Sequence, residues 1–481
     1  MFFNSYLFIL VFFPIVLIGY YSINRTGKYR LSEFFLLLMS AVFYGSFEIK
    51  SIPVIAGSIL VNYAMGRILE HRQSKVWLAA GILFNVLLLG VFKYLNFVLE
   101  NISGLIGGRV TLVEMIVPIG ISFMTFQQIS YIVDVYRNRN YGYSLMEYAL
   151  YVSFFPYVIS GPIVRHNELI PQLRDSGRKA FNAENFAKGL YAFILGLGKK
   201  VLIADTFAAV ANAGFNNVGS LNTTSALFAV LSYSLQIYFD FSGYSDMVLG
   251  IGKMLNLDMP INFNSPYKAA NILDFWKRWH ISLTRFLTEY IYFPLGGNRK
   301  GTVRTYINVM CVFAVSGIWH GASWTFVIWG LLHGAASVIT RMFRTKIEKM
   351  NQTACWILFF AFINFTWIFF RAATLNDAFT VIKTIVKCQF GLPPAEMTTA
   401  VLLPEIEMVL DLLGAVHPAL AAMILPAAAV TVTICVLVMR NTQEKLETFK
   451  PTAAKSLLCA VLLVWCVVSF SGVTSFIYVN F

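Results

Sequence analysis

The chain has 481 residues, of which 58% are hydrophobic and only 13% are charged. Soluble domains carry about 25% charged residues, so this composition excludes an ordinary soluble enzyme and a disordered chain. Whole segments are apolar instead of alternating with polar residues, which argues against a membrane β-barrel. The net charge of +13 is accounted for by the basic cytoplasmic loops of a multi-spanning protein, and nucleic-acid binding is not expected. The sequence predicts an all-α polytopic membrane protein.

The first apolar segment, residues 2–23, is predicted to be an uncleaved first span. Its cytoplasmic flank is the basic group Arg25, Lys28 and Arg30. The next apolar segments, each predicted to be a span, cover residues 33–47, 52–66, 76–98 and 115–133. The basic loops between them fall on the inside if each segment crosses once.

The stretch 147–163 contains YVSFFPYVISGP and precedes another basic cluster. A single crossing would place that cluster outside, so a re-entrant hairpin is expected. Non-helical backbone at membrane depth is tolerated only inside protein or beside a water-filled cavity. The segment therefore points to a cavity or tunnel.

Residues 253–304 form the longest polar interval, with eight basic and three acidic residues, and are predicted to be a cytoplasmic amphipathic and basic region. Between Cys388 and Met439 there is no lysine or arginine, so residues 388–417 are predicted to be an extracytoplasmic loop. Spans at 418–439 and 456–475 complete a total of about 11 to 12 spans, at roughly 20 residues each. The C-terminus is then outside.

Polar residues within apolar segments are rare and usually serve function or packing. One such group lies in QIYFDFSGYSDMVLG, residues 236–250, where Asp240 and Tyr244 share a face if the segment is helical. With Ser245 they are tunnel-lining candidates. A hydrogen-bond cluster that only fixes helix packing is the alternative.

The second group, NILDFWKRWHISLTRFLTEYIYFPLGGNR at 271–299, repeats aromatic residues every three or four positions among basic ones. This pattern is typical of an amphipathic helix at the membrane interface. Lys277 and Arg278 are donor-binding candidates because a basic surface attracts phosphates or an acidic carrier protein. His280 is either a packing residue or a participant in the reaction.

The third group, SGIWHGASWTFVIWG at 316–330, contains His320, and Trp324 close behind it is a further tunnel-lining candidate. A histidine near its ordinary pKa of about 6.5 is the commonest general base, although a satisfied core histidine is the alternative. Gly317 and Gly321 permit close backbone approach. His333 would not share a face with His320, and no metal site is expected. The remaining histidines, His71, His166 and His417, lie in loops or flanks and need no special role.

These three stretches, in this order, resemble the membrane-bound O-acyltransferases, in particular the bacterial branch of alginate O-acetylation and teichoic acid D-alanyl transfer proteins. The resemblance implies a helical ring around a transmembrane tunnel, with His320 as the active-site histidine and His280 as the second. It also implies no bound cofactor. The resemblance further implies that the substrate is a cytoplasmic acyl thioester, either acetyl-coenzyme A or an acyl carrier protein, and that the acceptor arrives from the other side.

The C-terminal residues FIYVNF, 476–481, resemble an aromatic motif of the same branch. That resemblance implies an acyl relay at Tyr478 and an extracytoplasmic partner that is an SGNH-hydrolase-like acyltransferase. Val479 departs from the motif, which has a second aromatic residue there. The alternative is an aromatic belt anchor that ends the last span in membrane lipid.

The sequence thus predicts one integral membrane acyltransferase domain over 1–481, in the bacterial cytoplasmic membrane, that O-acetylates a cell-surface or exported polysaccharide. Alginate, cellulose, peptidoglycan and teichoic acid all stay open as acceptors. A transporter or flippase for a polysaccharide or lipid-linked sugar fits the composition equally well. D-alanyl transfer to teichoic acid and a scaffold that recruits a soluble partner are further alternatives.

Overall fold

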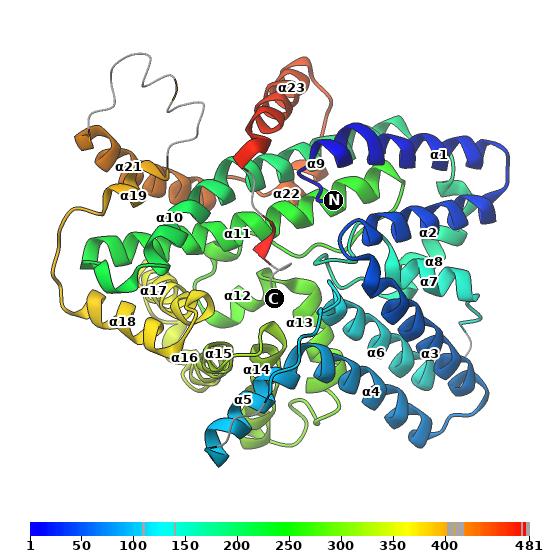
Figure 1. The fold of residues 1–481 in the computed structure, drawn as a ribbon, viewed down its shortest axis with the longest axis horizontal. Coiled ribbons are helices and arrows are strands. Elements are labelled where there is room, and N and C mark those ends of the chain that lie inside the picture. Colours follow the sequence, from blue (N-terminus) through cyan, green and yellow to red (C-terminus); the bar gives the residue numbers. More distant parts are fainter. Residues whose placement is uncertain (108–110, 139–140, 402–407, 409–417, 473–474, 478–481) are drawn as a thin grey trace. The chain divides into compact units, whose positions relative to one another are not determined.

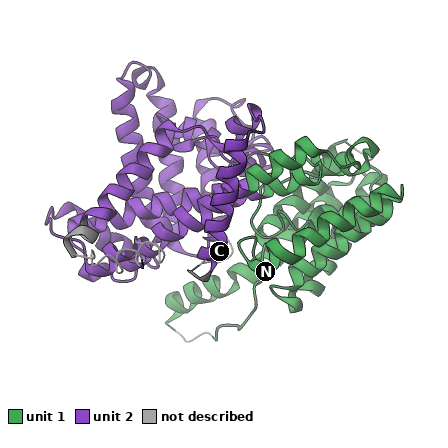
Figure 2. Ribbon diagram, turned by 90° about the horizontal axis from the view of Figure 1, so that it is seen from above, with its two compact units in different colours: residues 1–193, 248–260 green, residues 194–247, 261–481 purple. Residues whose placement is uncertain are grey.

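A computed structural model describes all residues except 108–110, 139–140, 402–407, 409–417, 473–474 and 478–481. Every regular element in the described ranges is a helix (Figure 1). The predicted all-α class is therefore confirmed. The chain forms two compact units (Figure 2): unit 1 comprises residues 1–193 and 248–260, and unit 2 comprises residues 194–247 and 261–481.

Unit 1 is built mainly from α1 to α8, and the bounds of α2, α3 and α4 follow apolar segments of the sequence. Two π-helical turns, η1 (Phe8–Phe12) and η3 (Gly90–Tyr94), extend α1 and link α4 to α5. A reciprocal cap between Ser144 and Glu147 starts α7. The helices are α1 (Phe13–Arg25), α2 (Tyr29–Gly45), α3 (Ile52–His71), α4 (Lys75–Leu89), α5 (Leu95–Ile106), α6 (Ile121–Asn138), α7 (Leu145–Ser153) and α8 (His166–Arg174), followed by α9 (Ala183–Gly198), which continues into unit 2.

The segment 147–163, predicted to be a re-entrant hairpin, is helical only as far as Ser153. The chain from Phe154 to Val164 is non-helical and buried. The backbone N–H of Phe155 donates to the Ser40 hydroxyl over 3.1 Å. Protein atoms therefore surround this irregular backbone and satisfy part of it, as a segment without helical hydrogen bonds requires.

His166, predicted to lie in a loop or flank without a special role, is part of the core of unit 1. It begins α8 and is fully buried. Its Nε2 lies 3.2 Å from Asp134 Oδ2, and its Nδ1 lies 3.1 Å from the Tyr143 hydroxyl. Both ring nitrogens have partners, which makes His166 a bonded core residue of unit 1.

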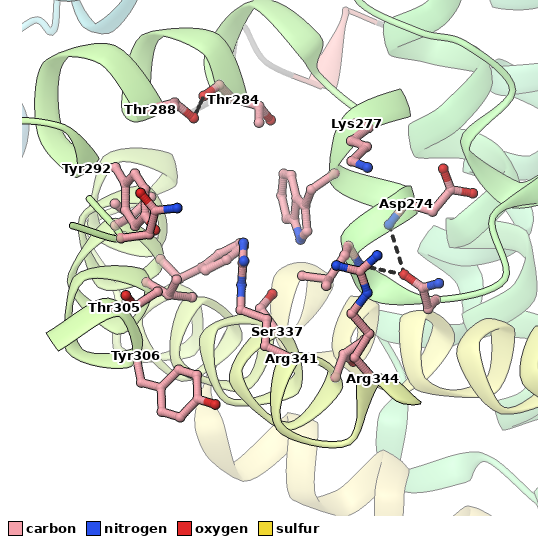
Figure 3. Close-up of a pocket in the computed structure, with 18 of the residues that line it drawn as sticks. Asp274, Lys277, Thr284, Thr288, Tyr292, Thr305, Tyr306, Ser337, Arg341 and Arg344 are labelled. Carbon is pink, nitrogen blue, oxygen red and sulfur yellow. Dashed lines mark hydrogen bonds between the residues drawn. The ribbon is translucent and has the colours of Figure 1, made fainter. Parts of the chain in front are cut away.

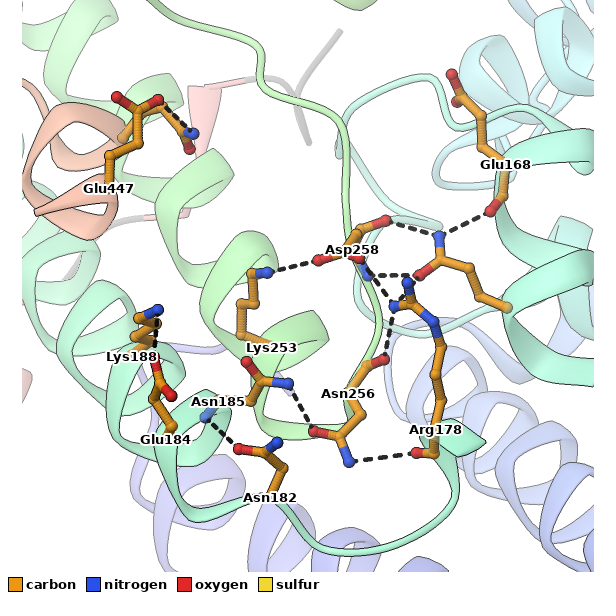
Figure 4. A network of polar contacts seen from close by, with 12 residues as sticks. Glu168, Arg178, Asn182, Glu184, Asn185, Lys188, Lys253, Asn256, Asp258 and Glu447 are labelled. Carbon is orange, nitrogen blue, oxygen red and sulfur yellow. Dashed lines mark hydrogen bonds and ion pairs between the residues drawn. The ribbon is translucent and has the colours of Figure 1, made fainter. Parts of the chain in front are cut away.

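A polar network in unit 1 joins the loop after Lys253 to the segment before α9 (Figure 4). The Asp258 carboxylate accepts from Lys253 and from Arg178 Nη1, the latter over 2.8 Å. Burial alone would raise the pKa of Asp258, but these two hydrogen bonds hold that pKa below its ordinary value. The network therefore fixes this loop most firmly while Asp258 is ionised.

Unit 2 contains the motifs that sequence analysis singled out. A π-helical turn, η5 (Lys199–Ala204), follows α9, and η8 (Thr288–Tyr292) follows α13. The helices are α10 (Asp205–Phe215), α11 (Thr223–Met254, whose last turns belong to unit 1), α12 (Ile272–Arg278), α13 (Ile281–Leu287), α14 (Thr302–His320), α15 (Trp324–Met342), α16 (Arg344–Ile347), α17 (Gln352–Arg371), α18 (Leu375–Val386), α19 (Ala395–Thr399), α21 (Pro418–Val438), α22 (Thr442–Glu447) and α23 (Ala453–Val468).

Helices α14 and α15 form a hairpin that crosses at two glycines. A methyl group added to Gly317 would lie 2.5 Å from the carbonyl oxygen of Phe326 and 3.2 Å from the Cα of Gly330. One added to Gly330 would lie 2.4 Å from the carbonyl oxygen of Phe313. Only glycine allows the two backbones to approach this closely, as the sequence predicted for Gly317.

Six helical segments of the described residues are long and apolar enough to cross a membrane. They are Phe8–Arg25, Ile49–His71, Lys75–Ile106, Thr302–His320, Trp324–Met342 and Gln352–Arg371. Two shorter apolar helical stretches match the last two predicted spans: Met423–Val438 lies within 418–439, and Ala453–Val468 overlaps 456–475 but begins three residues earlier. Large apolar side chains such as Leu83, Val86 and Leu87 on α4 are exposed, as on a surface that faces lipid. The protein is a multi-pass membrane protein.

Candidate active site

His320 is the last residue of α14 and is buried, with 3% of its surface exposed. Its Nδ1 lies 2.6 Å from the carbonyl oxygen of Ser316, one turn earlier. A carbonyl oxygen can only accept, so Nδ1 carries the proton and Nε2 carries the lone pair of the neutral ring. The helix thus holds His320 in the tautomer that a general base requires.

Aromatic side chains surround the His320 ring. The ring centroids of Trp319 and Trp329 each lie 4.9 Å from it, and that of Phe370 lies 5.3 Å from it. The indole N–H of Trp329 is buried and has no hydrogen-bond partner among the described residues. A hydrogen-bond donor beside His320 is therefore available to a bound molecule.

The prediction of one continuous amphipathic helix over residues 271–299 is wrong. Helix α12 ends at Arg278 and α13 begins at Ile281, because His280 between them adopts the left-handed conformation with φ of 45°. The aromatic residues Trp276, Trp279 and Phe286 are buried in protein, whereas an interfacial helix would expose them to lipid headgroups. Aromatic spacing alone does not distinguish these two environments, because both accept one apolar helix face.

The break at His280 brings the two histidines of the motifs together. His280 is fully buried, and its ring centroid lies 6.2 Å from that of Trp319. Trp319 in turn contacts His320. The two histidines, forty positions apart in sequence, therefore flank one indole ring. A non-glycine residue with positive φ costs of order 1–3 kcal/mol, and such strain gathers at functional sites.

His333, on α15, has a different environment. Its Nδ1 accepts from Trp276 Nε1 over 3.2 Å, and its Nε2 lies 3.1 Å from the Thr366 hydroxyl. The indole can only donate, so Nε2 carries the proton of the neutral ring and donates to Thr366. Both nitrogens of His333 are occupied, and its role is to hold α12, α15 and α17 together.

A cavity of about 810 Å³ lies in unit 2 next to these groups. It is lined by α12, α13, α14, α15 and the segments that follow them (Figure 3). Ser316, whose carbonyl holds His320, is one of its lining residues. The hydroxyls of Ser316 and Thr284 are buried and have no partner within the described part of the chain. The cavity therefore reaches Ser316, the residue whose carbonyl orients His320, and offers polar groups to a ligand.

Basic side chains gather around the same cavity. Lys277, a predicted donor-binding residue, lines it, together with Arg341 and Arg344 (Figure 3). Arg278 is not among the lining residues; its Nε donates to Asp274 Oδ1 over 2.9 Å. The sequence pattern does not indicate Arg341 and Arg344 as site residues, because they lie far from Lys277 along the chain and only the fold brings them to the same cavity.

The tunnel-lining candidates lie elsewhere in unit 2 and do not line this cavity. Asp240 and Tyr244 share a face of α11, and Asp240 Oδ1 lies 2.7 Å from Lys200 Nζ. Ser245 is buried on the same helix, whereas Trp324 is 52% exposed at the start of α15. A tunnel role for these four residues stays a prediction.

Lys200 and its second carboxylate partner, Asp205, were missed as site residues. Their signal is visible in the sequence: Lys199 and Lys200 interrupt an apolar run, and Asp240 and Asp246 interrupt the next one. Ionisable residues in two apolar segments are expected to pair. Tyr478 lies outside the described residues, as does half of the predicted loop 388–417, namely residues 402–407 and 409–417. Phe476 and Ile477, the first two residues of the C-terminal motif, are described.

The sequence was compared with protein families and with characterised proteins. The model of the membrane-bound O-acyltransferase family matches residues 48–376. A peptidoglycan O-acetyltransferase of Helicobacter pylori is 43% identical over 418 residues, which cover 80% of this chain and 79% of that protein. A probable alginate O-acetylase of Pseudomonas aeruginosa is 37% identical over 396 residues, covering 80% and 75%. A teichoic acid D-alanyltransferase of Bacillus subtilis is 28% identical over 255 residues, covering 50% and 62%. The chain therefore belongs to the membrane-bound O-acyltransferase family and is an O-acyltransferase.

Proposed function

We propose that this enzyme moves an acetyl group from a cytoplasmic thioester, across the bacterial cytoplasmic membrane, to hydroxyl groups of an extracytoplasmic carbohydrate polymer. The observation that carries the proposal is the cavity in unit 2. One of its lining residues, Ser316, holds His320 through its carbonyl oxygen, and basic side chains line the same space.

The cavity suits the donor. Lys277, Arg341 and Arg344 belong to basic segments that the positive-inside rule places in the cytoplasm. They would attract the phosphates of coenzyme A or of a carrier-protein phosphopantetheine arm. The hydroxyls of Thr284 and Ser316 would bind polar groups of the arm nearer His320.

His320 would act as general base. Its Nε2 takes the proton of the acceptor hydroxyl as the oxygen bonds to the thioester carbon. The C–S bond then breaks, and the departing thiolate takes the proton from the imidazolium. The indole N–H of Trp329, beside His320, is our candidate donor to the oxyanion formed between these steps.

Peptidoglycan is the acceptor that we favour. The relative from Helicobacter pylori, a peptidoglycan O-acetyltransferase, is more similar to this chain than the alginate O-acetylases that we compared. In our proposal Tyr478 carries the acetyl group as an ester before an extracytoplasmic SGNH-hydrolase-like acyltransferase delivers it to the polymer. The transfer onto Tyr478 follows the same bond changes, with the phenol oxygen as nucleophile.

The test is acetyl transfer by the purified full chain in liposomes, supplied inside with radiolabelled acetyl-coenzyme A or acetyl carrier protein. We expect label on the protein, and on peptidoglycan fragments when the extracytoplasmic partner is present. His320→Ala should abolish both, while His333→Gln keeps them per folded molecule. Label-free protein with transport of intact polymer would instead establish a transporter. Full transfer by His320→Ala would refute the assignment of the base.

A further inference from the structure

Lys200 of η5 is buried in unit 2 between two carboxylates. Its Nζ lies 2.8 Å from Asp205 Oδ1 and 2.7 Å from Asp240 Oδ1. Only 1% of the Lys200 side chain and 3% of the Asp240 side chain are exposed. Burying such charges costs several kcal/mol per ion, and well-packed apolar residues often serve stability as well or better. Stability alone therefore does not explain why ionic residues occupy this buried position.

The C-terminal segment Ser475–Ile477 binds directly to this cluster. Lys200 Nζ donates to the carbonyl oxygen of Ser475 over 3.2 Å. The backbone N–H of Ile477 donates to Asp240 Oδ2 over 2.9 Å. The cation of the ion pair, Lys200, therefore binds the carbonyl of Ser475, and its anion, Asp240, binds the backbone N–H of Ile477 two residues later.

The side chain between these two contacts is also held. The Phe476 ring is 2% exposed, and its centroid lies 4.8 Å from Lys200 Nζ, within cation–π distance. The Tyr244 ring meets it edge-on at 4.9 Å. Because backbone and ring are both fixed, the segment cannot slip by one residue without losing all these contacts.

We propose that Lys200, Asp240 and Tyr244 form a dock, the C-terminal dock, that positions residues 475–477 for acyl transfer. Lys200 and Asp240 are positioning residues in this proposal. The inference rests on the proposed function in one respect: the residue that the dock precedes is Tyr478, the proposed acyl carrier. The dock fixes the chain immediately before this residue and so determines where its hydroxyl reacts.

A purely structural role for the cluster can be separated from docking, because the same elements carry a second ion pair. Lys199 Nζ lies 2.6 Å from Asp246 Oδ2, and Thr442 at the start of α22 completes that pair. This pair joins η5 to α11 as the dock does, but it bonds to α22 instead of the C-terminal segment. Asp246→Asn is therefore the matched control for Asp240→Asn.

The first experiment measures docking without any acyl transfer. The purified full chain is treated with carboxypeptidase Y, and its intact mass is followed. We expect trimming of the wild type and of Asp246→Asn to stop near Tyr478, and trimming of Asp240→Asn and Lys200→Met to continue past Ser475. Lys200→Arg should restore the stop. Identical trimming of Asp240→Asn and wild type would overturn the dock.

The second experiment links the dock to transfer by a double-mutant cycle. Ile477→Pro removes the N–H that Asp240 accepts and leaves the buried ion pair intact. Loss of a hydrogen bond to a charged group should lower the rate of acetyl transfer roughly ten- to a hundredfold, with donor KM unchanged. Asp240→Asn combined with Ile477→Pro should be little slower than either single variant. Multiplicative losses would overturn the proposal, because they mean that the two groups act separately.

Failure of the proposed function has a different signature. If Tyr478→Phe transfers acetyl groups at the wild-type rate, the relay in the proposed function is wrong. The trimming experiment still decides whether the dock holds the segment. If Tyr478→Phe is inactive but Asp240→Asn trims and transfers like the wild type, the relay stands and the dock is refuted.

Discussion

The close crossing of α14 and α15 at Gly317 and Gly330 sets the position of His320. Disrupting this crossing should therefore displace His320. Gly317 lies three residues before His320 on α14, and an added methyl group would lie 2.5 Å from the Phe326 carbonyl oxygen. That contact is with backbone, which cannot rotate away. Gly317→Ala should therefore separate the two helices and displace His320 together with the Ser316 carbonyl that orients it.

A matched control is provided by Gly57 in α3, which is also helical and lies in an apolar candidate span. A methyl group added there meets nothing within 4 Å. Gly57→Ala should stabilise its helix by roughly 0.5–1 kcal/mol, the difference in helix preference. Gly317→Ala gains the same helix preference, but overpacking against α15 should destabilise the folded protein by about 1–3 kcal/mol. A shift of about 1 Å in a catalytic group can cost about a hundredfold in rate.

The assay combines thermal unfolding of the purified protein with acetyl transfer per folded molecule in liposomes. We expect Gly57→Ala to match or exceed the wild-type melting temperature and to keep full activity. Gly317→Ala should melt below Gly57→Ala and lose about ten- to a hundredfold in kcat. Equal melting and equal kcat for the two variants would refute the claim that the crossing positions His320.

Three further predictions follow from the site and from unit 1. Trp329→Phe keeps an aromatic ring but removes the unpartnered N–H. The kcat of this variant should therefore fall roughly 10²–10³-fold while its KM for the donor stays unchanged. An unaltered kcat would exclude the indole as oxyanion donor. Arg341→Glu and Arg344→Glu should each raise the KM for the donor, most strongly at low salt. The transfer rate at saturating donor should stay unchanged. A KM that does not depend on salt would contradict phosphate binding by these arginines. Because the folded-state pKa of Asp258 lies below its ordinary 3.8, its contribution to stability is complete above that pH and is lost as pH falls through the folded value. Melting curves should therefore show Asp258→Asn less stable than wild type at pH 6, and the difference should shrink below pH 3.8.

The sequence by itself predicted the class of the protein and indicated His280 and His320 as candidate site residues. Composition and uninterrupted apolar segments depend only on local residue content, so the all-α membrane class, α2, α3 and α4 follow from them. The motifs around His280 and His320 carry the resemblance to the family, which the comparisons confirm. The close approach at Gly317 was also predicted correctly, because a small residue in an apolar helix permits tight helix packing.

Only the tertiary structure decided how these residues meet. The left-handed backbone at His280 breaks a segment whose spacing predicts one helix, because the packing of buried aromatic rings overrides local periodicity. The tertiary structure also determines that His333 and His166 are bonded core residues. It likewise brings Lys200 and Asp240 into contact with the C-terminal segment. These contacts join residues tens to hundreds of positions apart. The free energy that selects them comes from mutual burial and pairing of charges, which no local pattern of the sequence contains.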